Sequence, residues 1–197
     1  MVSADSSAQA LWGGYLFAIK SEDGDTLTKT NLQAIKTFIA GSKGTNADML
    51  AISSPSEGLE FWNTTIKGKC VFDGTDWQRL SCSQTPTVTV GTGAGTGASA
   101  SVVGNDLGGV ISITAGTSPA TNATVVTLDF HTDFDQVPKS VSLTAADKNT
   151  IAFISTNSRA WYVDDSSITV DEFQITSDDV NTPTGGVTYK LFYKVSQ

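Results

Sequence analysis

Apolar and polar residues alternate along most of the second half of the chain. In residues 125–130, for example, Val126, Leu128 and Phe130 fall on one side of an extended backbone. Clusters of Gly, Asn, Asp, Ser and Pro interrupt this pattern at short intervals, so eight short strands and no helix are predicted. The eight segments are residues 100–104, 109–116, 123–130, 139–146, 150–156, 160–165, 167–177 and 187–195. They predict a mainly β fold with a C-terminal antiparallel β-sandwich head, jelly-roll-like in type.

Residues 30–41 have a helical period instead. Leu32, Ile35 and Ile39 recur at i, i+3 and i+7, behind a threonine N-cap and ahead of a terminal glycine. A helix of three turns is marginal alone in water, so it must pack on something. Isoleucine at both seam positions favours a trimeric coil. Packing of the helix within its own subunit is the alternative.

A small hairpin module is predicted between these two regions. Residues 59–65, 69–72 and 76–80 read as strands, and Asp73–Gly74 is a strong hairpin signal. Such a meander holds too little core to be stable alone, so it must dock or oligomerise.

Glycine occupies every second position from Gly91 to Gly97. The spacing does not match a dinucleotide fingerprint, and the chain has no lysine between Lys69 and Lys139 to complete a Walker loop. No helix is predicted to follow, so no helix N-terminus is available for a phosphate. We therefore interpret the stretch as a flexible spacer. The predicted parts of the chain are 1–45 (anchor and short helix), 46–83 (hairpin module), 84–97 (spacer) and 98–197 (head).

Charge narrows the class of partner. The chain has 20 acidic and 12 basic residues, a net charge of −8, which argues against a nucleic-acid partner. The N-terminus has no basic region before its apolar run, and the run at 10–19 is too short to span a bilayer. We expect a chain made in the cytoplasm that stays soluble until it assembles.

No constellation indicates catalysis, a metal or a cofactor. Cys70 and Cys82 flank a hairpin, so they could face each other or remain two free thiols. With His131 they give too few ligands for zinc, and His131 has no G-x-S-x-G nucleophile to serve. The carboxylate pairs Asp164–Asp165, Asp171–Glu172 and Asp178–Asp179 are adjacent in sequence. Neighbours on a strand point to opposite faces, so solvated turns and strand ends are the favoured interpretation.

The best candidate for ligand binding is the segment around Trp161. Trp161 and Tyr162 follow a turn that also carries Arg159, and aromatic faces with fixed polar groups commonly hold sugars. Packing of Trp161 in the core is the alternative.

Two stretches bear a resemblance to known proteins. Residues 54–80, SPSEGLEFWNTTIKGKCVFDGTDWQRL, resemble the P-x-E-G-x-x-x-x-N-T-T…K…F-D-G-T-x-W hairpin modules of bacteriophage tail and fibre proteins. Residues 91–130 resemble the opening of the C-terminal head domain of phage tail fibres and receptor-binding proteins. VPKSVSLTAAD, WYVDDSSITVDEFQITS and TYKLFYKV continue this likeness.

The resemblance implies a non-enzymatic, homotrimeric virion protein that binds a host cell-surface receptor through its head, with a glycan as the candidate receptor. A capsid decoration (head-fibre) protein and a small glycan depolymerase are the alternatives, and a cellular carbohydrate-binding module is a further one. The N-terminal Trp12, Tyr15 and Phe17 have no place in the resemblance. On physical grounds they would anchor the chain in another virion protein, or else fold onto their own subunit.

Overall fold

The computed structural model describes residues 10–12, 15–17, 42–157, 161–178 and 182–197. The chain divides into two units, Met1–Ser42 and Lys43–Gln197. In the first unit, β1 (Ala10–Trp12) and β2 (Tyr15–Phe17) form an antiparallel hairpin with Trp12 opposite Tyr15. The predicted helix over 30–41, with Leu32, Ile35 and Ile39, lies outside the described residues, as do the side chains of Trp12, Tyr15 and Phe17.

The rest of the described chain is mainly β, as predicted. Three four-stranded sheets are present there, with two short helices and two 3-10 turns. The sheet of the hairpin module contains β3 (Ser42–Gly44), β4 (Glu60–Asn63), β5 (Gly68–Phe72) and β6 (Trp77–Arg79), with α2 (Asn46–Leu50) beside it. No helix in the described ranges is long and apolar enough to cross a membrane.

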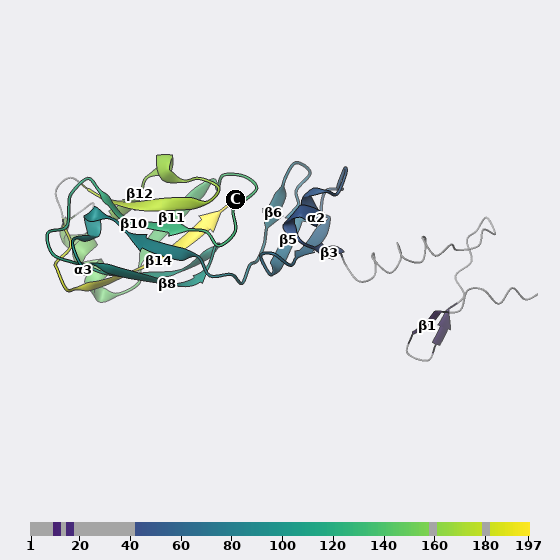
Figure 1. Ribbon diagram of the computed structural model, residues 1–197, viewed down its shortest axis with the longest axis horizontal. Helices are drawn as coiled ribbons and strands as arrows, with labels where there is room; N and C mark the ends of the chain where they lie inside the picture. The colour runs from purple at the N-terminus through teal and green to yellow at the C-terminus, as the bar shows by residue number, and fades with distance from the viewer. Residues whose placement is uncertain (1–9, 13–14, 18–41, 158–160, 179–181) are drawn as a thin grey trace, which may run out of the picture. The chain divides into compact units, whose positions relative to one another are not determined.

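The other two sheets are antiparallel and form the head. The first has the order β12 (Trp161–Val163), β13 (Glu172–Ser177), β10 (Thr124–Asp129), β7 (Thr87–Val90). The second has the order β11 (Ser140–Ala145), β14 (Thr188–Ser196), β9 (Gly108–Thr114), β8 (Ser99–Asn105). The remaining head elements are the 3-10 turns η1 (Thr92–Ala94) and η2 (Asp165–Ser167) and the helix α3 (Lys148–Asn157). Figure 1 shows β12 and β10 in one layer and β14 and β8 in another.

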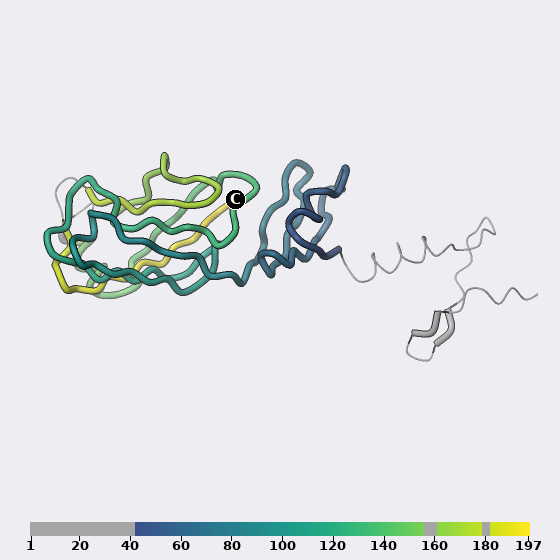
Figure 2. Tube along the Cα trace, viewed as in Figure 1, coloured from purple at the N-terminus to yellow at the C-terminus, as the bar shows by residue number. Residues whose placement is uncertain are grey.

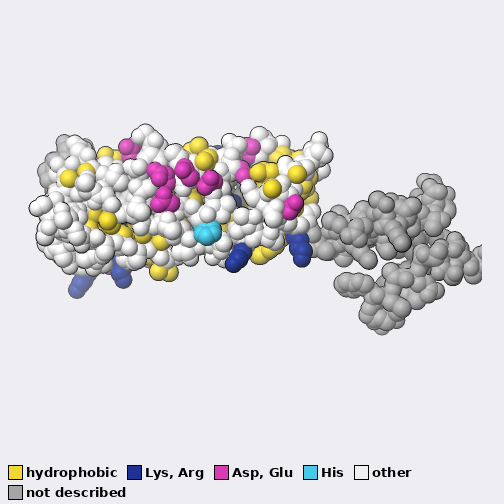
Figure 3. Space-filling model, viewed as in Figure 1, with side chains coloured by type: hydrophobic (Ala, Val, Ile, Leu, Met, Phe, Trp, Pro, Cys, Tyr) yellow, Lys and Arg dark blue, Asp and Glu magenta, His cyan; other side chains and the backbone are white. Residues whose placement is uncertain are grey.

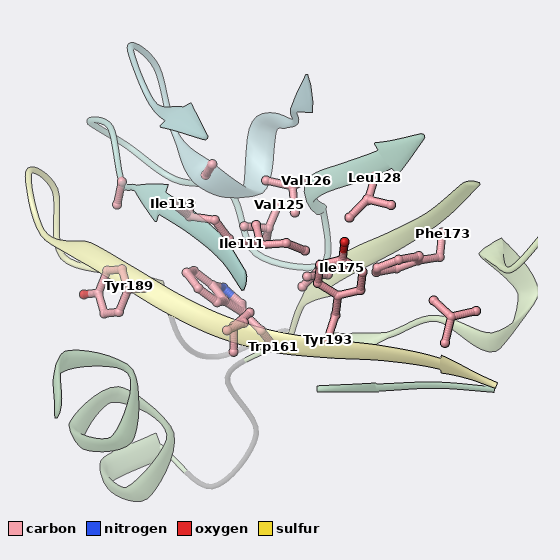
Figure 4. Packing of buried hydrophobic residues seen from close by; sticks show 14 of the residues in the cluster. Ile111, Ile113, Val125, Val126, Leu128, Trp161, Phe173, Ile175, Tyr189 and Tyr193 are labelled. Atoms are coloured by element: carbon pink, nitrogen blue, oxygen red, sulfur yellow. The ribbon is translucent and has the colours of Figure 1, made fainter. Parts of the chain in front are cut away.

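Both head sheets bury their inner faces in one core. Alternate residues of β14 are buried, and Leu191 and Tyr193 meet Phe173 and Ile175 of the opposite sheet in a single cluster. Figure 4 shows Phe173, Ile175 and Tyr193 converging between the two layers. Full burial of one large apolar side chain contributes about 1.5–3 kcal/mol, so this shared core holds the two sheets together.

The hairpin module matches its prediction in β4, β5 and β6. Phe61 and Trp77 point into a separate small core, with ring centroids 6.0 Å apart. Asn63 is fully buried: its side-chain amide donates to Asn46 Oδ1 at 2.8 Å, and its Oδ1 accepts from the Thr65 amide at 3.0 Å. The N-T-T motif therefore ties the β4–β5 turn to the start of α2, which the sequence pattern did not predict.

Arg79 joins the module to the head. Its guanidinium donates to Asp106 Oδ2 at 3.1 Å and to the carbonyls of Thr132 at 3.1 Å and Asp133 at 2.8 Å. Its Cζ lies 4.0 Å from the ring centroid of Phe134. The Arg79 and Asp106 side chains are 6% and 0% exposed. The module is thus connected to the head by a buried, fully engaged ion pair rather than by a loose tether.

The prediction of a spacer over 84–97 is wrong for most of its length. Thr87–Val90 forms β7, which pairs with β10, and Gly93 and Ala94 of η1 are buried. A Cβ on Gly91 would lie 2.1 Å from the Thr124 carbonyl oxygen, and one on Gly93 2.6 Å from that of Ala123. The glycines permit close backbone packing beside β10, and Figure 2 shows this part of the trace within the head.

The strand predicted over 150–156 is also wrong, because this segment is part of α3. Asp147 Oδ1 accepts from the Thr150 amide at 2.8 Å, which caps the helix. Thr150, Phe153 and Ile154 face inward at i, i+3 and i+4, whereas Ile151 is exposed. The β-branched residues of this segment favour a strand locally, but capping and packing of the helical face prevail.

Candidate binding surfaces

Trp161 lies in the core of the head. Its side chain is 8% exposed, and its ring centroid is 5.3 Å from those of both Phe153 and Tyr189. The indole Nε1–H is buried without a hydrogen-bond partner. Figure 4 shows the ring among the other core side chains. In this position Trp161 has no free face on which a sugar could stack, so the structure supports the core alternative.

Tyr162 points the other way. Its side chain is 46% exposed and stands opposite Thr176 on the outer face of the sheet β12–β13–β10–β7. Arg159, the third residue of the predicted site, lies outside the described residues. Of the two aromatic residues in the predicted site, Trp161 is buried and Tyr162 is exposed.

The outer face that carries Tyr162 also bears carboxylates. Asp129 of β10 is paired in register with Glu172 of β13, and both lie on the solvent side of the sheet. Figure 3 shows acidic side chains gathered in the middle of one face of the head. We call this surface the acidic face, defined by Asp129, Glu172 and Tyr162.

Two of the predicted carboxylates, Asp164 and Asp171, have local hydrogen-bond partners. Asp164 caps η2 by accepting from the Ser166 amide at 3.0 Å, and Asp171 accepts from the Thr169 hydroxyl. Asp179 lies outside the described residues. Across the described ranges, no group of three or more His, Cys, Asp or Glu residues is placed to hold a metal ion.

His131 and the two cysteines have structural positions. His131 Nε2 lies 3.1 Å from the Gln84 side-chain amide, and the His131 backbone N–H donates to Asp106. Cys70 and Cys82 are free thiols in the small core, and Cys70 pairs in register with Arg79 rather than with Cys82. Burial raises the pKa of the Cys70 thiol to about 11 and also raises the pKa of Cys82. Both thiols are therefore protonated and unreactive near neutral pH.

The sheet β11–β14–β9–β8 has a different outer face. Thr144, Phe192, Val110 and Val103 are aligned in one row across its four strands. Phe192 is 50% exposed and Val103 is 75% exposed. Lys190 and Lys194 flank Phe192 on the same side of β14. We call this surface the Lys–Phe face, defined by Lys190, Phe192, Lys194, Val110 and Val103.

Sequence reasoning missed the Lys–Phe face, although a signal for it was present. Residues 190–194 alternate strictly, so the two lysines and Phe192 share one side while Leu191 and Tyr193 share the other. The partners of Phe192 on β9 and β8 depend on strand order and register, which alternation within one segment does not reveal. The Arg79–Asp106 contact had no local signal at all.

In comparisons with protein-family models, curated proteins and solved structures, no match to this chain was found.

Proposed function

We propose that this chain is a structural fibre or receptor-binding protein of a bacteriophage virion, which attaches the virion to the host surface by non-enzymatic adhesion. In this proposal the chain is made in the host cytoplasm and acts as a homotrimer in the virion. Trp12, Tyr15 and Phe17 anchor it to another virion protein, and Leu32, Ile35 and Ile39 form the trimer seam.

The observation that carries the proposal is the pair of broad outer sheet faces. The head buries its inner faces in one core and still presents exposed aromatic residues, Tyr162 and Phe192, on opposite outer faces. Aromatic residues are enriched among those that carry binding energy at protein interfaces. The resemblance of residues 54–80 and 91–130 to phage fibre modules supports the same class of protein.

We also propose that the two head sheets form a β-sandwich. The β8–β9 and β12–β13 connections are hairpins within a sheet, and the other connections cross between sheets. The order β7–β10–β13–β12 matches the A-B-E-D sheet of immunoglobulin-like sandwiches. This arrangement fits a Greek-key sandwich of that kind better than the jelly-roll type predicted from the sequence.

The proposal is tested on virions and on purified protein. Antibody-labelled electron micrographs of virions should place the chain on a fibre or tail tip. Purified protein should bind host cells and reduce virion adsorption by competition. The proposal would be ruled out if the antibody does not label virions and the purified protein does not bind host cells.

The same experiments separate the alternatives. Labelling over the whole capsid, with no competition for adsorption, would favour the decoration protein. Release of reducing ends from host capsule or lipopolysaccharide would indicate a depolymerase. A depolymerase would need two convergent carboxylates, and the candidates on the acidic face are Asp129 and Glu172.

A further inference from the structure

We propose that the Lys–Phe face binds an anionic polysaccharide. Phe192 would stack on the apolar side of a pyranose ring, and Lys190 and Lys194 would pair with carboxylate or phosphate groups on neighbouring sugars. The inference rests on the proposed function, because it names the class of ligand that adhesion would use.

The three side chains are arranged in a line along one strand. Lys190, Phe192 and Lys194 alternate with the buried Tyr189, Leu191, Tyr193 and Val195, so they share the solvent side of β14. At a rise of about 3.3 Å per residue, the two lysine Cα atoms are about 13 Å apart with Phe192 midway. An extended polymer running along β14 would therefore meet positive, aromatic and positive groups in turn.

The surroundings of Phe192 leave its ring accessible. The lysines on either side of Phe192 have small cross-strand neighbours. Lys194 is paired with Ser142 on β11 and Gly108 on β9, and Lys190 is paired with Ser112 on β9. These small side chains do not rise above the sheet, and their hydroxyl groups are available to hydrogen-bond a sugar. Phe192 and Val103 thus project from a low, polar surface.

The charge of this face is opposite to that of the molecule. The net charge of the chain is −8, yet β8, β9, β11 and β14 contain no aspartate or glutamate. Within the described ranges, neither Lys190 nor Lys194 forms an ion pair. Asp147, which follows β11, accepts from the Thr150 amide and hydroxyl and also has a Coulombic interaction with Lys190, so Lys194 is the lysine of this face without a nearby acidic partner of this kind among the described residues. The face is therefore the part of the head that an anionic host surface would attract.

A second copy of the chain is a less suitable occupant. A two-fold contact of the Lys–Phe face with itself would bring the lysines of both copies together, and like charges in an interface are costly. A contact between the Lys–Phe face of one copy and the acidic face of the next would join opposite sides of the head. Copies joined in this way stack in one direction, so they form an open filament instead of a closed oligomer. Double-stranded nucleic acid is disfavoured by its charge density: it carries one charge per about 1.7 Å of helix axis, so two lysines about 13 Å apart would leave most of those charges unpaired.

The test measures binding of the full-length chain to three polymers by biolayer interferometry. Polygalacturonate carries carboxylates on pyranose rings, dextran has the rings without charge, and polyglutamate has the charge without rings. We expect binding to polygalacturonate and much weaker binding to dextran. The K190Q/K194Q variant should lose roughly tenfold in affinity for both anionic polymers, since exposed ion pairs are individually weak but are repeated in linked copies. Phe192→Ala should weaken binding to polygalacturonate alone.

The matched control is K69Q/K148Q, which removes two exposed lysines from other elements and should bind as the wild type does. Unchanged binding by K190Q/K194Q, equal binding to dextran, or no wild-type binding to polygalacturonate would each overturn the proposal. A lower molar mass of Phe192→Ser in light scattering would identify the face as a subunit interface and also overturn it. Binding to host cells distinguishes failure of this inference from failure of the proposed function. If the wild type and K190Q/K194Q bind host cells equally, the chain is an adhesion protein but the Lys–Phe face is not its binding site. If the wild type binds no cells, the proposed function itself fails.

Discussion

At the scale of single residues, adjacent aromatic side chains have opposite roles. Trp161 and Tyr162 are neighbours on β12, but one is packed against Phe153 and Tyr189 and the other is exposed. From the sequence, Trp161 and Tyr162 were together the best candidate for ligand binding. The sequence could not assign the pair to core and surface, because that assignment depends on how β12 pairs with β13.

Substitution of each aromatic residue should separate these roles. Trp161→Ala should lower the free energy of unfolding by about 3–5 kcal/mol, because it opens a cavity in the core. Tyr162→Ala should change it by about 0.5 kcal/mol or less, as is usual for exposed positions. Urea unfolding of both variants measures the difference. A Trp161→Ala variant that unfolds like the wild type but loses host binding would return Trp161 to the binding site.

The glycines between β7 and β8 are the second residue-scale feature. Gly91→Ala should destabilise the protein by about 1–3 kcal/mol or more, because the new methyl group would overlap the Thr124 carbonyl oxygen. Thr92→Ala, an exposed change one residue away, is the control and should have little effect. Thermal melting of the two variants is the measurement. Equal melting temperatures would support the flexible spacer that the sequence predicted.

At the scale of elements, sequence patterns were reliable where they were local. The β4–β5–β6 meander follows from alternation and the Asp73–Gly74 turn, and these signals lie within about 20 residues of one another. The pattern failed for β7 and α3. β7 pairs with β10, far along the chain, and α3 follows from a cap at Asp147 and from packing on β14. Both depend on tertiary contacts that a local pattern does not contain.

Loss of one partner of the Arg79–Asp106 ion pair, which connects the module to the head, should strongly destabilise the protein. Arg79→Met should cost about 3–5 kcal/mol, because it leaves the Asp106 carboxylate buried without its charged partner. Lys69→Met removes the exposed Lys69–Glu60 pair and should cost about 1 kcal/mol or less. The double variant R79M/D106N should recover part of the loss, because it removes the buried charge while the new amide oxygen can still accept from the His131 N–H. Denaturant unfolding checks all three, and equal effects of the two single variants would contradict the structural role of Arg79.

At the scale of the whole molecule, the chain combines a self-contained body with a separate N-terminal unit. Residues 43–197 have two hydrophobic cores joined at Arg79, so the hairpin module buries its core residues and docks on the head of its own chain. The sequence argument for a trimer relied partly on a hairpin module too small to stand alone. Docking onto the head satisfies that need. The case for a trimer now rests on the Leu32, Ile35 and Ile39 stripe.

That stripe leads to the last prediction. Light scattering of the full-length chain should give about three times the monomer mass of 20.6 kDa. The variant I35D/I39D should be a monomer with an unchanged β-type circular dichroism spectrum, because charges in the seam disrupt the coil while the cores of residues 43–197 remain intact. Gln33→Glu, a charge change at position b, away from the seam, should remain trimeric. A wild-type monomer at micromolar concentration would contradict the prediction. A trimer that survives I35D/I39D would place its contacts in the strand-rich body instead, where Val103 and Phe192 would be the first positions to test.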